Sequence, residues 1–345
     1  MKIVGCDLHT RYQQIAMLDE ETGELVERRL EHESGEARAF YAALSAAVRV
    51  GIEATGHTRW FERMLAELGH ELWIGDAAQI RASMVRKQKT DARDAAHLLD
   101  LLLSDRFPRI WRPTLEERDL RQLVWHRQKL VWMRNAVGNQ LHALAMGEGV
   151  CRKKKLFTKK GRAELESLAL GPWASHRRQE LLEMLDRLDP SLQQLDRAVQ
   201  QQAEQNAEAV RLMTHPGVGP VTSLAFVLTI GPVGRFERSK QVVSYLGLNP
   251  REHSSGGRQR LGAISKQGNP MMRSLLVEAG HTAARLDAEL RQDYQRLKLR
   301  RGTGVAKVAM ARKLAVRMYW MLRSQAGYAQ LVRMQGSPWA TLVKE

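Results

Sequence analysis

The first hundred residues combine short segments of alternating apolar and polar residues with longer segments that have helical spacing. Five segments have strand character: KIVGCDL, QQIAMLD, ELVERRL, RVGIEAT and HELWIG. Helical spacing is found at residues 36–47, 58–69, 77–86 and 91–103. The first three strands follow one another, and the other two alternate with helices. This order predicts a mixed sheet covered by helices, which is an α/β domain.

The pattern changes near Pro108 and Pro113, after which long helices are predicted. Residues 115–146 form the first, with apolar residues seven positions apart: Leu123, Leu130, Val137 and Leu144. The second begins near His176, and its apolar residues step by fours and threes: Leu181, Leu185, Leu188, Leu192, Leu195 and Val199. This spacing is typical of a coiled-coil seam, either within one chain as an antiparallel hairpin or between two chains. Pro190 leaves open whether the second region is one helix or two.

From about Arg211 the pattern predicts a small all-α domain. THPGVGP places Gly217 and Gly219 in a tight turn before a helical run. Such a turn is typical of a helix–hairpin–helix, whose backbone N–H groups face a nucleic-acid phosphate, and it also fits an ordinary turn between helices. A basic loop (residues 251–260), a helix over 269–286 and a basic helical stretch over 296–313 follow.

Charge is distributed unevenly over the three predicted domains, residues 1–108, 109–208 and 209–345. The 345-residue chain has a formal net charge of +16. Residues 1–105 carry 13 Lys and Arg against 18 Asp and Glu, whereas residues 106–345 carry 41 against 20. A strongly basic surface releases counterions when it neutralises phosphates, so a nucleic acid is the expected partner. The basic loop RKKKLFTKKGR between the long helices suits phosphate contacts or simple solvation, and its central lysines are Lys153, Lys154 and Lys155.

Cysteine content and hydropathy point to the cytoplasm. Cys6 and Cys151 are the only two cysteines, too few for a disulfide framework or a Cys-rich metal site, which fits a reducing compartment. The sequence enters a strand-like segment at once, so we expect no signal peptide. No apolar stretch approaches the roughly 18–20 residues that span a bilayer, so we expect no membrane partner.

Four acidic residues form the pattern that a nuclease uses for divalent cations. Asp7 and Glu53 end predicted strands, and Asp91 and Asp94 lie three apart on one face of a predicted helix. Two cations about 3.5–4 Å apart stabilise the attacking and leaving oxygens of a phosphodiester, and Mg²⁺ prefers carboxylate oxygens. Each acid taken alone also fits a turn, a helix cap, an ion pair or a solvated face. Together, with acids inside the apolar contexts GCDL and GIEAT, they favour a metal site.

Two groups of segments, in order, carry a family resemblance over nearly the whole chain. MKIVGCDLHTRYQQIAMLD, GIEATG and KTDARDAAHLLDLL closely resemble the RuvC-like N-terminal domain of the DEDD transposases of bacterial insertion sequences. THPGVGP and FERSKQVVSYLGLNPREHSSGGRQRLGAISKQGNPMMRSLLVEA resemble the C-terminal transposase domain of the same family. The resemblance implies a ribonuclease-H-like domain, a helical coiled-coil middle and a small helical transposase domain.

The resemblance also implies an activity and its residues. Family members move their element by site-specific recombination between donor and target DNA, guided by a structured non-coding RNA. The four family acids correspond to Asp7, Glu53, Asp91 and Asp94, which would hold Mg²⁺. The family's nucleophilic serine, immediately before a glycine, corresponds to Ser255 and not to its neighbour Ser254.

In that mechanism Ser255 forms a covalent phosphoserine link to DNA. Five nearby basic residues would hold phosphates: Arg251, Arg258, Arg260, Lys266 and Arg273. The acids and the serine lie far apart in sequence, so they meet through folding or through assembly of a dimer or tetramer.

Three other functions fit parts of the sequence. A RuvC-like metal-dependent junction-resolving nuclease with water as nucleophile explains the acids but leaves the SSGG loop without a role. An ATPase of the actin and sugar-kinase type would need a second phosphate loop and a Gly-rich adenosine site in its later half, and the sequence has neither. A non-catalytic RNA-binding protein that retains the fold would not need the four acids.

Overall fold

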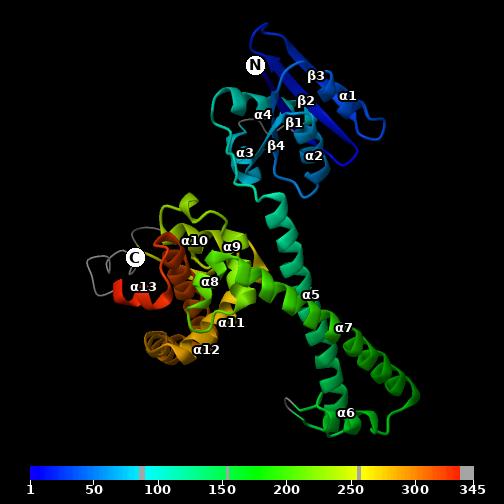
Figure 1. Cartoon of the computed structure of the whole chain (residues 1–345), viewed down its shortest axis with the longest axis vertical. Helices are drawn as coiled ribbons and strands as arrows, with labels where there is room; N and C mark the ends of the chain where they lie inside the picture. Colours follow the sequence, from blue (N-terminus) through cyan, green and yellow to red (C-terminus); the bar gives the residue numbers. More distant parts are fainter. Residues whose placement is uncertain (85–89, 153–154, 255–257, 335–345) are drawn as a thin grey trace. The chain divides into compact units, whose positions relative to one another are not determined.

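The structure, a computed structural model, describes residues 1–84, 90–152, 155–254 and 258–334 (Figure 1). The chain divides into two compact units, Met1–Arg112 and Pro113–Glu345. Ser255, Lys153 and Lys154, which the sequence singles out, lie outside the described residues.

A five-stranded mixed sheet forms the centre of the first unit. Its strands are β1 (Lys2–Leu8), β2 (Tyr12–Asp19), β3 (Leu25–Glu31), β4 (Val48–Glu53) and β5 (Glu71–Gly75). They lie in the order β3-β2-β1-β4-β5. The pairs β1–β2 and β2–β3 are antiparallel, and β4 runs parallel to both β1 and β5. The mixed sheet that the sequence predicts is therefore confirmed.

Helices cover both faces of this sheet, because the alternation of side chains makes both faces apolar. They are α1 (Glu36–Ala42), α2 (Arg59–Glu67), α3 (Ala77–Ser83) and α4 (Asp91–Leu103). One face packs Val4, Cys6 and Ile52 against α1 and α2. The other packs Ile3 and Ala16 against α3 and α4. Helix α1 is shorter than predicted and ends at Ala42.

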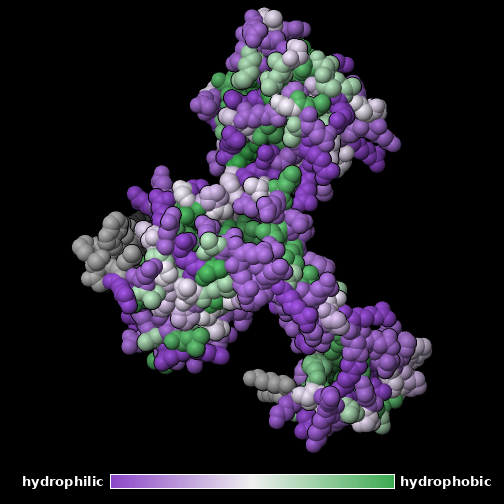
Figure 2. All heavy atoms as spheres, in the orientation of Figure 1, coloured by the Kyte–Doolittle hydropathy of each residue, from purple (hydrophilic) through white to green (hydrophobic). Residues whose placement is uncertain are grey.

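Two long helices open the second unit and pair antiparallel. They are α5 (Leu115–Gly147) and α7 (Pro172–Gln205), with the short α6 (Lys159–Glu166) between them. One cluster joins the end of α5 to the start of α7 through Leu141 and Leu182. Arg134 reaches Asp189 across the pair. The spacing allowed a hairpin within one chain or a seam between two chains, and the structure has the hairpin within one chain. Figure 2 shows mostly hydrophilic residues over the visible face of this hairpin.

The buried faces of α5 and α7 follow the predicted spacing unequally. Four of the six predicted positions on α7 are buried: Leu181, Leu185, Leu192 and Val199. Helix α7 runs through Pro190 without a break, and Pro190 is exposed. On α5 only Val137 of the four predicted positions is fully buried, because α5 contacts both α7 and α9 and has no single seam.

The rest of the second unit is a helical core with one small hairpin. Its elements are α8 (Ala207–Met213), α9 (Pro220–Ile230), α10 (Ser239–Tyr245), β6 (Pro250–Glu252), β7 (Leu261–Ile264), α11 (Pro270–Leu286), α12 (Ala288–Arg323) and α13 (Tyr328–Met334). Helix α9 is buried on all sides, and α11 packs along α12, which bends at Gly302. The predicted helix over 269–286 is confirmed, whereas the β6–β7 hairpin was not predicted. Within the described parts of the chain, no helix combines the length and apolar character needed to cross a bilayer.

Candidate active site

The four predicted acids lie in the first unit, and the pleat of the sheet explains where their side chains go. Along a strand, side chains alternate between faces, so Gly5 and Asp7 of β1 share the face that α4 covers. On the parallel strand β4, Ile52 packs on the opposite face, so Glu53 also belongs to the α4 face. The carboxyl ends of the two strands are adjacent, which brings Asp7 and Glu53 to one edge of the sheet.

Helix α4 supplies the other two acids from its first turn. Thr90 caps the helix, accepting a hydrogen bond from the Arg93 amide at 3.4 Å. Asp91 and Asp94 follow directly, where negative charge is favoured by the helix dipole. A Cβ atom on Gly5 would lie 2.2 Å from the Ala95 carbonyl oxygen, so the missing side chain lets α4 lie directly on β1.

Two of the acids meet around a histidine that the sequence analysis did not single out. His9 Nε2 lies 3.1 Å from Asp7 Oδ2 and 3.5 Å from Asp91 Oδ2. One ligand atom from each of these three residues lies within 4.8 Å of the others. His9 follows Asp7 by two positions, at the turn between β1 and β2. This closeness in sequence is the signal by which His9 could have been recognised. We call Asp7, His9 and Asp91 the carboxylate–imidazole cluster.

Tyr12 holds one side of the cluster in place. Its hydroxyl donates a hydrogen bond of 2.9 Å to Asp91 Oδ2, and this bond raises the pKa of Tyr12. The Tyr12 ring stacks on the His9 ring with centroids 4.6 Å apart. The Arg29 guanidinium lies 3.8 Å from the Tyr12 ring centroid, so the tyrosine is fixed from both sides.

The other two acids lie near this cluster but outside it. Burial raises the pKa of Asp7; the His9 imidazole opposes this, and the carboxylates of Asp94 and Asp91 add to it. Asp94 is thus close enough to repel the Asp7 charge. Glu53 lies 3.8 Å from Arg81 of α3. The structure therefore brings Asp7 and Asp91 together directly, with Asp94 and Glu53 on the same face.

This donor set fits a divalent cation. Carboxylate oxygens and an imidazole nitrogen are common metal ligands, and mutual repulsion between the acids is relieved by a positive ion. Asp7 and Asp91 would supply the closest oxygens, and the partly exposed cluster leaves positions for water or a phosphate.

The basic loop that contains Ser254 joins the two strands of the β6–β7 hairpin. At its base, the His253 amide donates to the Arg260 carbonyl at 2.9 Å. The Ser254 hydroxyl donates to Glu252 Oε1 at 2.6 Å and accepts from the Arg260 amide at 3.1 Å. Ser254 therefore has a structural role in closing the loop.

The five predicted phosphate ligands around this loop differ in their availability. Four are exposed and form no ion pair with another described residue: Arg251, Arg258, Arg260 and Lys266. Arg273 is half-buried, and its Nη1 donates to the carbonyls of Leu246 and Gln267. Burial lowers the pKa of Arg273. Arg273 thus connects α11 to the segments on both sides of the hairpin, at Leu246 before it and Gln267 after it.

The remaining predicted nucleic-acid contacts are partly accounted for by packing. Gly217 has a φ of 85°, and a Cβ atom there would lie 2.5 Å from the Ala283 amide of α11. Gly219 precedes α9 and faces open space. Lys155 of the basic loop is exposed. Two arginines of the same loop form ion pairs: Arg152 with Glu164, and Arg162 with Glu166 and Asp186.

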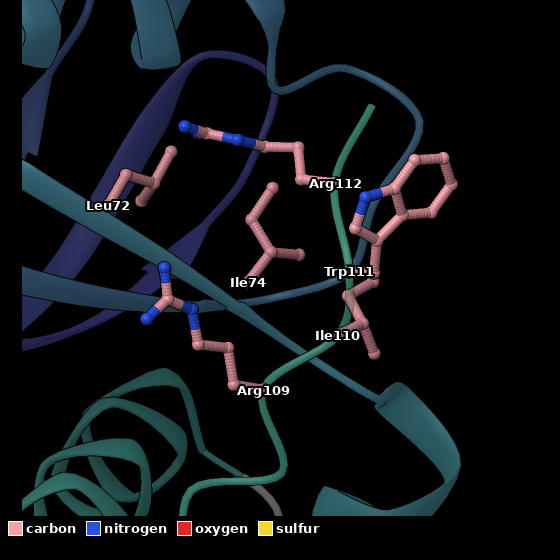
Figure 3. Close-up of a pocket in the computed structure, with 6 residues that line it drawn as sticks. All are labelled: Leu72, Ile74, Arg109, Ile110, Trp111 and Arg112. Atoms are coloured by element: carbon pink, nitrogen blue, oxygen red, sulfur yellow. The ribbon is translucent and has the colours of Figure 1, made fainter. Parts of the chain in front are cut away.

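A pocket of about 410 Å³ lies elsewhere in the first unit (Figure 3). Its lining residues are Leu72, Ile74, Arg109, Ile110, Trp111 and Arg112. Figure 3 shows the guanidinium groups of Arg109 and Arg112 on either side of Ile74. None of the predicted site residues lines it.

Two family models match the chain. The DEDD transposase model of the IS110 type matches residues 4–147, and the model described as "Transposase IS116/IS110/IS902 family" matches residues 209–295. The chain belongs to the IS110 family of transposases.

The mixed sheet of this family member is consistent with a RuvC-like DEDD domain. IS110-family transposases cut and rejoin DNA, so the chain is an enzyme with DNA as its substrate. Domains of the DEDD type use divalent metal ions, which agrees with the chemistry of the cluster.

Relatives support the same family. The chain is 29% identical over 337 residues to the "Probable family 20 transposase" of Pseudomonas aeruginosa, covering 93% of this chain and 96% of the relative. It is 29% identical over 343 residues to the transposase for insertion sequence element IS1111A of Coxiella burnetii, covering 95% and 91%. It is also 27% identical over 232 residues to the pilin gene-inverting protein of Moraxella bovis, covering 65% and 64%.

Proposed function

We propose that the chain is an RNA-guided DNA recombinase that works through a covalent phosphoserine intermediate. The observation that carries this proposal is the meeting of Asp7 and Asp91 at one edge of the sheet, in a chain of the IS110 family. Asp7, Glu53, Asp91 and Asp94 hold Mg²⁺ in this proposal. Bound there, the cation stabilises negative charge on the reacting phosphate and lowers the pKa of an attacking hydroxyl.

Ser255 is the nucleophile in the proposed reaction. Its Oγ attacks a DNA phosphorus, a P–Oγ bond forms, and the bond from phosphorus to the 3′ oxygen breaks. The serine proton leaves to a base and the released 3′ oxygen takes up a proton. The 3′-hydroxyl of the exchanged strand then attacks the phosphoserine phosphorus, and Ser255 recovers its proton, so no ATP is needed. The structural role of Ser254 supports this choice between the two serines.

The basic hairpin holds the DNA backbone in this proposal. Arg251, Arg258, Arg260 and Lys266 are exposed beside the loop, and the planar guanidinium binds phosphate oxygens in pairs. Arg273 contributes mainly by fixing the hairpin's base, with its remaining N–H groups directed to a phosphate. Gly219, at the open start of α9, presents its backbone N–H to another phosphate in the manner of a helix–hairpin–helix.

Several further features belong to the same proposal. A structured guide RNA selects the donor and target DNA by base pairing, and Lys153, Lys154 and Lys155 contact its phosphates. In this proposal the chain has three functional domains, residues 1–108, 109–208 and 209–345, of which the middle one is a coiled coil. A dimer or tetramer assembles the acids and the serine into one active site. The protein acts in the cytoplasm, at the bacterial nucleoid.

A covalent-adduct assay tests the proposal directly. The chain, its element RNA and both DNA sites are incubated with Mg²⁺, and protein–DNA adducts that survive denaturing detergent are measured. We expect adducts with the unchanged chain and with Ser254→Ala, and none with Ser255→Ala. Asp91→Asn and EDTA are expected to abolish cleavage while RNA binding persists.

Two results would contradict the proposal in different ways. Adducts with Ser255→Ala would exclude this serine as nucleophile. Metal-dependent cleavage that never yields an adduct would instead support the junction-resolving nuclease, in which water attacks the phosphate.

A further inference from the structure

The imidazole of His9 lies between the two acids that the proposed function assigns to the metal. Its Nε2 atom is 3.1 Å from Asp7 Oδ2 and 3.5 Å from Asp91 Oδ2. Around an octahedral ion with ligands at about 2.1 Å, adjacent ligand atoms lie about 3 Å apart. The two distances from His9 Nε2 are thus close to that spacing, and all three ligand atoms lie within 4.8 Å of one another, so small movements would bring them onto one ion.

We propose that His9 is a nitrogen ligand of the catalytic cation, and that this ligand makes the site prefer Mn²⁺ to Mg²⁺. The inference rests on the proposed function, because it requires a cation between Asp7 and Asp91. It adds a ligand that is not one of the four family acids, and a metal preference that follows from that ligand.

The chemistry of the donor atoms gives the direction of the preference. Mg²⁺ prefers hard oxygen ligands, loses its water reluctantly and gains little from an imidazole. Mn²⁺ accepts the same octahedral geometry and the same carboxylates, and as a first-row transition ion it gains more from a nitrogen donor. Exchanging one oxygen ligand for the His9 nitrogen thus lowers the affinity for Mg²⁺ relative to that for Mn²⁺.

The surroundings of His9 hold its ring in the orientation that a ligand needs. The His9 amide donates to the Tyr12 carbonyl at 3.0 Å, which closes the turn between β1 and β2. The His9 and Tyr12 rings stack with an interplanar angle of 30°. The Tyr12 hydroxyl also binds Asp91 Oδ2, so one tyrosine orients both the nitrogen and an oxygen donor. A side chain oriented in this way loses little further freedom when it binds a metal.

A second role for His9 is compatible with the same distances. In that role the single N–H at Nε2 only donates a hydrogen bond to Asp7 Oδ2, close to Asp91 Oδ2, and the imidazole never touches the cation. The roles differ in one respect that can be measured: only a ligand places its nitrogen within bonding distance of the metal.

Pulsed electron paramagnetic resonance of bound Mn²⁺ reports that nitrogen directly. The full-length chain is loaded with Mn²⁺ alone, and modulation of the signal by ¹⁴N of an imidazole is recorded. His9→Gln removes the proposed ligand, Asp91→Asn removes an oxygen ligand, and His57→Gln is the matched control, since His57 is an exposed histidine of the same unit. Circular dichroism verifies that each variant is folded.

We expect ¹⁴N modulation in the unchanged chain and in His57→Gln, and its loss in His9→Gln. The Mn²⁺ affinity of His9→Gln should fall about tenfold or more. Its Mg²⁺ affinity, measured by competition with Mn²⁺, should change by much less. His9→Asp restores a third ligand as oxygen and should move the Mn²⁺/Mg²⁺ affinity ratio toward Mg²⁺.

The outcomes separate this inference from the proposed function. If Mn²⁺ binds and Asp91→Asn abolishes binding, but no imidazole modulation is seen, then His9 is not a ligand and the metal role of the acids stands. If the chain binds no Mn²⁺, both the inference and the metal role in the proposed function fail.

Discussion

Gly5 of β1 lies directly against the backbone of Leu99 in α4. A Cβ atom on Gly5 would come within 2.4 Å of the Leu99 amide nitrogen. Neither backbone can move alone, since β1 is the central strand and α4 is packed along it. This contact sets the distance between the strand that carries Asp7 and the helix that carries Asp91.

Gly5→Ala should therefore disturb the active site without touching any of its side chains. The added methyl forces α4 away from β1, and overpacking of this kind costs about 1–3 kcal/mol of unfolding free energy. We expect a lower urea midpoint and weaker Mn²⁺ binding in the same variant. Gly56→Ala is the control, because Gly56 has open space around it and no positive φ. Equal effects of the two substitutions would show that the close contact does not position α4.

The strands and helices of the first unit were predictable because their signals are local. The predicted and observed bounds of α4 coincide at residues 91 and 103, since Thr90 caps the helix and leucines mark its buried face. The β6–β7 hairpin gave no such signal. Most of its residues are exposed, so no apolar alternation reveals it.

The candidate site was predictable in its acids and not in its histidine. Acids within apolar strands are unusual, and that marked Asp7 and Glu53. His9 stands in an ordinary turn, and its importance depends on Asp91, which lies more than eighty residues later. On α5, Val137 is buried as predicted and Leu123 and Leu144 pack partly buried against the apolar clusters, while the neighbouring Val124 and Leu141 are buried more completely.

Tyr12→Phe tests whether the tyrosine positions Asp91. The substitution keeps the ring that stacks on His9 and removes only the hydroxyl that donates to Asp91 Oδ2. Groups that orient a metal ligand typically contribute tenfold or more to metal affinity, so we expect about a tenfold weaker Mn²⁺ affinity. The ¹⁴N modulation from His9 should persist. An unchanged Mn²⁺ affinity would mean that Asp91 holds its position without this bond.

Only one of the two cysteines should react in the native protein. Burial raises the pKa of the Cys6 thiol well above its ordinary value, and the side chain is fully enclosed between the sheet and its helices. Cys151 is exposed. A thiol reagent such as DTNB should therefore modify one group rapidly in the native chain and two in urea. The Cys151→Ser variant provides the control, since its native form should not react. Rapid native labelling of that variant would contradict the packing of β1.

His215 should make the second unit less stable below neutral pH. It is fully buried, and desolvation lowers its pKa to about 4; the Pro216 carbonyl and Asp287 oppose this shift, while Arg317 adds to it. The unfolded chain binds the proton at about 6.5, whereas the folded chain does not bind it until about pH 4. Between these values the unfolded state carries more protons, so the free energy of unfolding falls as the pH is lowered from 6.5 to 4.

The size of this effect is about 3 kcal/mol over the full window, since one unit of pKa corresponds to about 1.4 kcal/mol. Urea unfolding of the chain at pH 7.5, 6.0, 5.0 and 4.0 measures it, with His215→Asn as the comparison. The variant is expected to be less stable at pH 7.5 because it loses the packing of the histidine ring on the Tyr328 ring, whose centroids lie 4.3 Å apart. Its stability should nevertheless fall less steeply with acid, because asparagine takes up no proton. Parallel pH profiles for the two proteins would mean that the pKa of His215 is the same in the folded and unfolded chains, in conflict with its burial.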